Sequence, residues 1–441
     1  MGMLIYYLMP IIFLTGVLAI ALEDVIKINK AATAVGMCVL LWFLYLVGVQ
    51  DFNSVPFKGQ TYETIENLLI NSLGNVSTTL FFVLASMAII EEVDEFGGFD
   101  IITNSIKVNK GRKLLWIICL ITFFVSALFG DIAAVIIMIA IARKLIPDNG
   151  KRLLFSCMII IAANAGGCCS PIGDVTTLLL WTNKNFLAAH QISTLILPAF
   201  TMLLIPLIFT TFAIPKDEVY NKHTTNKEEA YLKISPKLRQ IVFIIGIASL
   251  ALVPLLQSLF NLPPFMGVLL GLVILWGITD RKFFSSKDKD LSNLKVCRVF
   301  KQLDISTIFF FLGILMSVQA LNGAGQLNYL ANALHKIFSN SNDIAVIFGI
   351  CSSFLDNVAL VSATMGMFPI EQAGDFATNG NFWTLLSYCA VTGGSILIIG
   401  SASGVTAMGL EKISFGYYLK RFTFYVLGGF FAGIAVFWLL T

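Results

Sequence analysis

Three aspartates, Asp131, Asp174 and Asp356, lie inside long apolar stretches of the sequence, where carboxyl groups are rare. An ionisable side chain in such a setting is energetically costly and usually marks an ion pathway, a proton relay or a binding site. Desolvation favours the protonated form of the carboxyl group, and a hard alkali cation competes with the proton for the same oxygens. The three aspartates therefore predict exchange of a proton and a cation at shared carboxylates.

Amide and hydroxyl side chains follow or precede these aspartates and would supply the oxygen ligands that hard cations prefer. For a single serine or threonine, the plainer alternative is a hydrogen bond to the preceding helical turn. We expect Na+ as the metal ion, no cofactor and no catalytic residue. The candidate oxygen donors are Ser126, Asn164, Ser170, Thr176, Thr177, Ser353, Asn357, Thr392, Ser395, Ser401 and Ser403.

Two apolar segments are interrupted by glycine-rich runs, NAGGCCSPIGD at 164–174 and TGGSILIIGSAS at 392–403. Pro171 lacks an amide hydrogen and breaks the helical ladder, and glycines tolerate unwound backbone. Unwound backbone inside a membrane must be buried in protein or face a water-filled cavity, where its freed carbonyls can bind an ion. We therefore expect broken helices at about 153–182 and 382–408, with a packing kink as the simpler alternative.

The composition places these segments in a membrane protein. Of the 441 residues, 57% are hydrophobic and only 12% are charged, whereas a soluble chain has roughly a quarter charged residues. We predict an all-α polytopic protein whose surroundings are the lipid bilayer, with no nucleic-acid partner. Spans are expected at 3–22, 31–49, 77–90, 153–182, 192–214, 241–260, 265–279, 305–321, 382–408 and 422–440.

Two further apolar stretches, at about 114–142 and 344–368, are interrupted near their middles and are predicted to be re-entrant hairpins. With that topology, all but three of the 29 lysines and arginines lie on one side of the membrane. The basic side is cytoplasmic by the positive-inside rule. We therefore predict a multi-pass protein of the cell inner (plasma) membrane with both termini outside. The three exceptions are Lys58, Lys184 and Lys336.

Three separate motifs repeat at an offset of about 227 residues. FFVL at 81–84 matches FFFL at 309–312, the glycine pair at 166–167 matches that at 393–394, and 126–131 aligns with 352–357. The offset divides the chain into a first repeat at 1–214, a cytoplasmic linker at 215–239 and a second repeat at 240–441. Because each half would contain five spans and one hairpin, the halves are inverted, as in many secondary transporters.

At these segments the chain resembles the NhaD-type sodium/proton antiporters of the ion-transporter superfamily. The matching segments are NAGGCCSPIGDVTTLLLW at 164–181, SFLDNVALVSATMGMF at 353–368, TGGSILIIGSASGVTAMGLEK at 392–412 and SFGYYL at 414–419. The resemblance implies exchange of Na+ or Li+ for H+ by alternating access, a homodimer, and a scaffold with a mobile transport domain. It implies ion-binding roles for Asn164, Asp174, Thr176, Thr177, Asp356, Asn357, Ser395, Ser401 and Ser403, to which the buried position of Asp131 adds a tenth candidate.

The first hairpin departs from the family pattern. The family typically has Asp-Asn-Leu-Thr-Thr at the tip, whereas the gap-free match at 130–134 reads Gly-Asp-Ile-Ala-Ala. The aspartate is therefore shifted by one position and two hydroxyls are absent, which bears on ion selectivity and stoichiometry.

Two other functions fit parts of the pattern. The same fold could carry a dicarboxylate, or an arsenite-type substrate at Cys168 and Cys169, although a dicarboxylate carrier would have Ser-Asn-Thr motifs at its hairpin tips. An intramembrane aspartyl protease could use the Gly-Asp pairs at 130–131 and 173–174 to activate water. The sequence contains no GxGD motif, so the protease is the least favoured of these functions.

Overall fold

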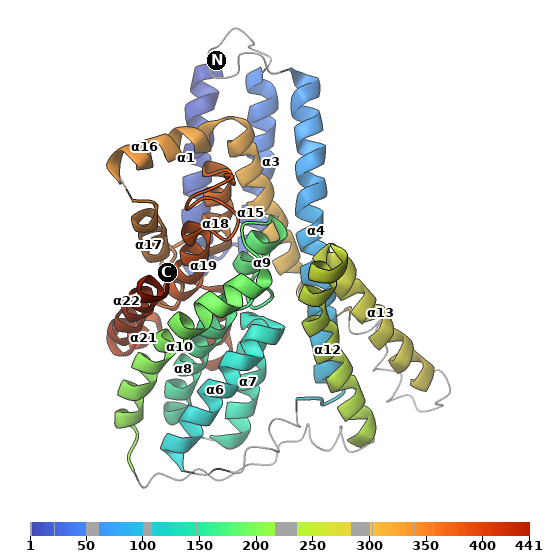
Figure 1. Ribbon diagram of the computed structural model, residues 1–441, viewed down its shortest axis with the longest axis vertical. Helices are drawn as coiled ribbons and strands as arrows, with labels where there is room; N and C mark the ends of the chain where they lie inside the picture. Colours follow the sequence, from blue (N-terminus) through green and yellow to red (C-terminus); the bar gives the residue numbers. More distant parts are fainter. Residues whose placement is uncertain are drawn as a thin grey trace.

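The chain forms a bundle of helices in the computed structural model (Figure 1). The only β pairing in the described residues is an isolated bridge between Glu371 and Ala377. Eight described helices are long and apolar enough to cross a membrane, so the predicted all-α, multi-pass class is confirmed. The structure describes residues 2–21, 23–49, 61–99, 108, 110–146, 148–216, 236–283, 300–301, 303–338, 340–355 and 357–441.

The helices before the linker include one that is much longer than its predicted span. The span expected at 77–90 belongs to a helix that starts at Tyr62, where the Thr61 side chain accepts a hydrogen bond from the Thr64 amide. Its first turns are polar, so hydropathy alone does not reveal them. The helices are α1 (Gly2–Ala21), α2 (Glu23–Ile26), α3 (Lys30–Val49), α4 (Tyr62–Glu95), α6 (Gly111–Phe129), α7 (Asp131–Leu145), α8 (Asn149–Cys168), α9 (Val175–Thr182) and α10 (Ala188–Ala213).

The helices after the linker include an amphipathic one, α16, that was not among the predicted spans. It runs across the long axis of the molecule (Figure 1), with Leu327 buried and Tyr329 exposed. Gln326 donates a hydrogen bond to the Tyr6 carbonyl and ties α16 to α1. The helices are α12 (Pro236–Phe260), α13 (Pro264–Phe283), α15 (Ile305–Gly323), α16 (Gln326–Ile337), α17 (Ser341–Cys351), α18 (Asn357–Met367), α19 (Asn381–Gly393), α20 (Ala402–Glu411), α21 (Phe415–Arg421) and α22 (Thr423–Leu440).

The helices pack in two groups. One group contains α1, α3, α4, α12, α13 and α15, and the other contains α6–α10 together with α17–α22. In the second group α8 and α19 pack against each other and are buried along most of their lengths. The apolar window of α8 is 83% buried, more than that of any other candidate span. These two central helices lead into the glycine-rich runs.

Close backbone approaches join a neighbouring helix to each central helix. A Cβ atom on Gly166 of α8 would clash with the carbonyl oxygen of Phe123 on α6. A Cβ atom on Gly393 of α19 would clash in the same way with the carbonyl oxygen of Gly349 on α17. Only glycine therefore fits at these two positions.

Serine hydroxyls make a corresponding pair of contacts. Ser126 of α6 donates to the Ala163 carbonyl of α8 over 2.5 Å, and Ser352, just after α17, donates to the Ala390 carbonyl of α19 over 2.6 Å. The packing of α6 on α8 thus has the same glycine contact and the same serine contact as that of α17 on α19.

Candidate functional site

Both central helices end in unwound backbone followed by a short helix. The chain leaves the helix at 169–174, between α8 and α9, and again at 394–401, between α19 and α20. Asp174 caps the N-terminus of α9, and Ser401 caps that of α20. Polar side chains at both breaks are thereby fixed by the helices they start.

Asn164 joins α8 to the second break. Its Nδ2 donates hydrogen bonds to the Ser395 hydroxyl at 2.6 Å and to the Ser401 hydroxyl at 3.1 Å. The Ser403 hydroxyl donates to its Oδ1 at 2.7 Å, and the four side chains are at most 2% exposed. The structure therefore brings four of the predicted site residues into one buried network.

The Asp174 carboxylate accepts hydrogen bonds from a residue of the first half of the chain and from a residue of the second half. Its Oδ1 accepts bonds from the Thr176 amide at 2.6 Å and from the Thr176 hydroxyl at 2.5 Å. Its Oδ2 accepts a bond from Asn357 Nδ2, at the start of α18, at 3.3 Å. Thr177 completes the cap, because the Asp174 amide donates to its hydroxyl oxygen at 3.2 Å.

Asp131, at the turn between α6 and α7, lies close to Asp174. Gly130, with φ +90°, forms the turn between α6 and α7, and the Asp131 amide donates to the Gly173 carbonyl at 3.0 Å. The Asp131 carboxyl group interacts with the Asp174 carboxyl group and the Ser403 hydroxyl. The shift of this aspartate by one position therefore leaves it within the site.

The third predicted aspartate, Asp356, lies outside the described residues, so its part in the site remains a prediction. The neighbouring Asn357 begins α18. Asp131 begins α7, Asp174 caps α9 and Ser401 caps α20. Together with α18, the N-terminal ends of four helices therefore lie around the carboxyl groups of Asp131 and Asp174. Helix N-termini carry partial positive charge, which stabilises anionic side chains there.

A cavity of about 330 Å³ opens onto the site. Both Asp131 and Asp174 line it, so the two carboxyl groups share one solvent-accessible space. Further residues of its lining come from the other helix group: Lys30 of α3, Glu91 and Asp94 of α4, and Asp304 and Thr307 at the start of α15. The cavity therefore connects the breaks to a charged rim.

Two buried polar residues support the breaks and were not predicted from the sequence. The Tyr418 hydroxyl, in α21, donates to the Ser395 carbonyl at 2.7 Å. Gln191, in α10, donates from Nε2 to the Cys168 carbonyl at 2.9 Å. Both side chains are 0% exposed. A polar residue within the apolar stretch 188–213 was the available signal for Gln191.

The adjacent cysteines pack as small buried side chains. Each thiol lies near the carbonyl of the residue three positions earlier, Cys168 near Ala165 and Cys169 near Gly166, both at 3.1 Å. Across the described part of the chain, no three His, Cys, Asp or Glu side chains cluster in a way that could hold a metal ion. A soft-metal site is therefore not supported there.

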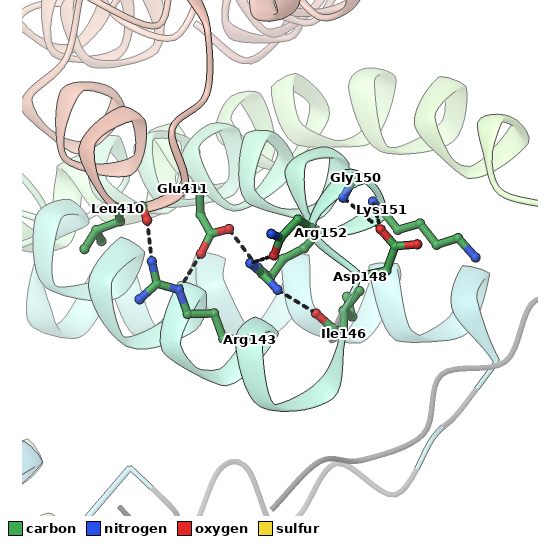
Figure 2. A network of polar contacts seen from close by, with 9 residues as sticks. Arg143, Ile146, Asp148, Gly150, Lys151, Arg152, Leu410 and Glu411 are labelled. Carbon is green, nitrogen blue, oxygen red and sulfur yellow. Dashed lines mark hydrogen bonds and ion pairs between the residues drawn. The ribbon is translucent and has the colours of Figure 1, made fainter. Parts of the chain in front are cut away.

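An ion-pair network fixes the far end of α20 (Figure 2). Glu411 accepts bonds from Arg143 Nε of α7 at 2.5 Å and from Arg152 Nε of α8 at 2.7 Å. Its side chain is only 2% exposed. Arg143 also donates to the Leu410 carbonyl, and Arg152 to the Ile146 carbonyl at 3.0 Å. Thus α20 is attached to the first half of the chain at both of its ends.

Apolar helices that cross a membrane, broken at a buried polar centre that opens to a cavity, define the class of membrane transporters. The sequence profile of the citrate transporter family matches residues 8–381, most of the chain. The chain belongs to this family.

Similar proteins include several sodium/proton antiporters. Sodium/proton antiporters 1 and 2 of Arabidopsis thaliana are each 36% identical to this chain, over 97% of its length and over 71% and 97% of their own. The Na(+)/H(+) antiporter NhaD of Vibrio cholerae is 28% identical over 96% of this chain and 89% of its own. The NhaD-type resemblance is thereby confirmed.

Proposed function

We propose that the protein exchanges Na+ or Li+ for H+ across the membrane, with Asp131 and Asp174 as the groups for which cation and proton compete. The observation that carries this proposal is that the two carboxyl groups interact with each other and face one cavity. The names of the similar antiporters support the choice of ions.

The competition follows from electrostatics. Two neighbouring carboxylates that are shielded from bulk water repel each other, and either a proton or a bound cation relieves the repulsion. Binding Na+ therefore releases a proton, and protonation releases Na+. The Thr176 hydroxyl and the Asn357 side chain bond to Asp174, and they hold its carboxylate in one orientation.

The remaining predicted residues position the site and supply further oxygen ligands in this proposal. Thr177 caps α9, and Asn164 joins α8 to Ser395, Ser401 and Ser403. We propose that their oxygens complete the coordination of a hard cation. Asp356, next to Asn357 in sequence, is assigned to the same site.

The proposed architecture is an inverted repeat of residues 1–214 and 240–441, joined by the linker at 215–239, of which 217–235 lie outside the described residues. The matched glycine and serine contacts of α6 on α8 and of α17 on α19 support the repeat. In this architecture α6–α7 and α17–α18 are re-entrant hairpins. They move with α8–α10 and α19–α22 against the other helix group and expose the site to each side in turn.

The distribution of basic residues supports a plasma-membrane orientation with both termini outside. We further propose a homodimer, on the basis of the resemblance to the antiporter family. The protein acts as a carrier and not as an enzyme, in keeping with the transporters it resembles.

Citrate, or another di- or tricarboxylate, is the second candidate substrate because the matching family is described as citrate transporters. The site disfavours it, since two carboxyl groups facing the cavity would repel an anion. An arsenite-type substrate has no comparable support, because Cys168 and Cys169 are buried against their own helix.

The test is sodium-dependent collapse of a respiration-generated pH gradient in everted vesicles, followed with a pH-sensitive dye. Wild type and an Asp343→Asn control, altered at an exposed residue of α17, are expected to release protons on addition of NaCl or LiCl. Asp174→Asn is expected to abolish the response. The proposal would be overturned in favour of citrate transport if well-expressed wild type released no protons with NaCl or LiCl and accumulated labelled citrate.

A further inference from the structure

A second pair of carboxyl groups lies away from the cavity, where α4 packs against α13. Glu91 and Asp94 of α4 line the cavity, but Glu92 does not. The Glu92 side chain is 0% exposed, and it interacts with Thr279 and Asp280 near the end of α13. This group is separate from Asp131 and Asp174.

Three buried oxygen atoms in this group have no hydrogen-bond donor among the described residues. They are both carboxylate oxygens of Glu92 and Oδ1 of Asp280. The other oxygen of Asp280 accepts a bond from Trp276 Nε1 at 2.7 Å, which fixes the orientation of this carboxylate. A buried carboxyl group and a partly buried one therefore lie beside each other, and a described residue donates a hydrogen bond to only one of their four oxygens.

The Thr279 hydroxyl also lies beside the Glu92 carboxyl group. It donates its hydrogen to the carbonyls of Leu275, at 3.0 Å, and Trp276, at 3.1 Å. Its oxygen is a third oxygen atom beside the two carboxyl groups. Buried oxygens without donors carry a large desolvation penalty, and a metal cation offsets that penalty by coordinating them.

We propose that Glu92, Thr279 and Asp280 form a binding site for a hard metal cation between α4 and α13. Carboxylate and hydroxyl oxygens are the ligands that such cations prefer. The site lies within the group of α1, α3, α4, α12, α13 and α15. A cation bound there links α4 to α13 and stabilises that group whether or not the central site is occupied.

Trp276 provides an internal reporter, because its indole is bonded to one of the proposed ligands. The experiment uses the full-length protein carrying Asp131→Asn and Asp174→Asn, purified in detergent, so that these two carboxylates, which line the central cavity, are absent. Choline chloride is replaced by NaCl, LiCl, MgCl2 or CaCl2 at constant ionic strength. The two readouts are the thermal unfolding midpoint and the tryptophan fluorescence.

At least one of the four cations is expected to raise the unfolding midpoint and to change the fluorescence. Glu92→Gln and Asp280→Asn are each expected to raise its half-saturating concentration at least tenfold. Trp276→Phe should remove the fluorescence change and retain the shift in the midpoint. Glu66→Gln, at an exposed position of the same helix, is the matched control and should respond like its parent.

Glu92→Gln is expected to fold, because the amide supplies a hydrogen-bond donor to the neighbouring oxygens. The proposal is overturned if no cation changes either readout, or if both variants keep the parental half-saturation. Because the test is made without Asp131 and Asp174, its failure leaves the proposed exchange activity untouched. Failure of the vesicle assay, in turn, leaves this site untouched.

Discussion

The amide of Asn164 donates a hydrogen bond of 2.6 Å to the hydroxyl of Ser395, which lies 231 residues away in the sequence. This bond and those to Ser401 and Ser403 connect α8 to the break that follows α19 and to the first turn of α20. A single side chain of the first half of the chain thus holds the unwound segment of the second half. The first prediction concerns its removal.

Asn164→Ala is expected to lower the thermal unfolding midpoint and to abolish exchange. The substitution leaves buried hydroxyls without their partner, at a cost of about 1–3 kcal/mol for each unsatisfied group. Asn75→Ala, at an exposed position of α4, is the control and should leave both measurements unchanged. An Asn164→Ala protein with wild-type stability would show that the network does not hold the second break against α8.

Asp131→Asn is expected to weaken Na+ binding and to stabilise the protein in sodium-free buffer. The loss of one carboxylate removes a cation ligand, and a change of about 1.4 kcal/mol corresponds to a tenfold rise in half-saturating Na+. The same change removes repulsion toward Asp174, so the unfolding midpoint should rise. Sodium titrations of exchange in vesicles and of the midpoint in detergent measure the two effects. An unchanged half-saturation would exclude Asp131 as a ligand.

Gly166→Ala and Gly393→Ala are each expected to prevent accumulation of folded protein. The added methyl group would overlap the carbonyl oxygen of Phe123 or Gly349, and backbone atoms cannot move aside cheaply. Gly36→Ala is the matched control, because no atom lies within 4 Å of its added Cβ. In the helix interior it should stabilise the protein by about 0.5–1 kcal/mol. The yield of monodisperse protein in detergent distinguishes these outcomes, and a normal yield of either variant would contradict the close packing.

Glu411→Gln is expected to destabilise the protein, because Arg152 would keep its charge in a largely buried place. Breaking a buried ion pair typically costs about 3–5 kcal/mol, and the partial exposure of Arg143 should place the cost below that range. Glu371→Gln, at an exposed position, is the control. Thermal unfolding midpoints measure the effect. If the two variants were equally stable, the network in Figure 2 would not anchor α20.

Several features of the protein could be read from the sequence because they depend on local physical chemistry. Apolar runs of sufficient length require a membrane, and the run around Pro171 cannot continue a regular helix. Carboxyl groups within such runs are rare enough to be noticed singly, which identified Asp131 and Asp174. The polar start of α4 and the amphipathic α16 were missed, because neither has the hydropathy of a span.

The tertiary structure decided which of these residues meet. The partners of Asn164 lie more than 230 residues away, and no local pattern encodes the packing of α8 against α19 that brings them together. The same holds for Glu411, whose two arginine partners lie more than 250 residues away. Local sequence sets where a helix begins and breaks, whereas side-chain partners at long range are set by how the two halves pack. The sequence therefore identified most members of the site, and only the folded chain showed the contacts they make.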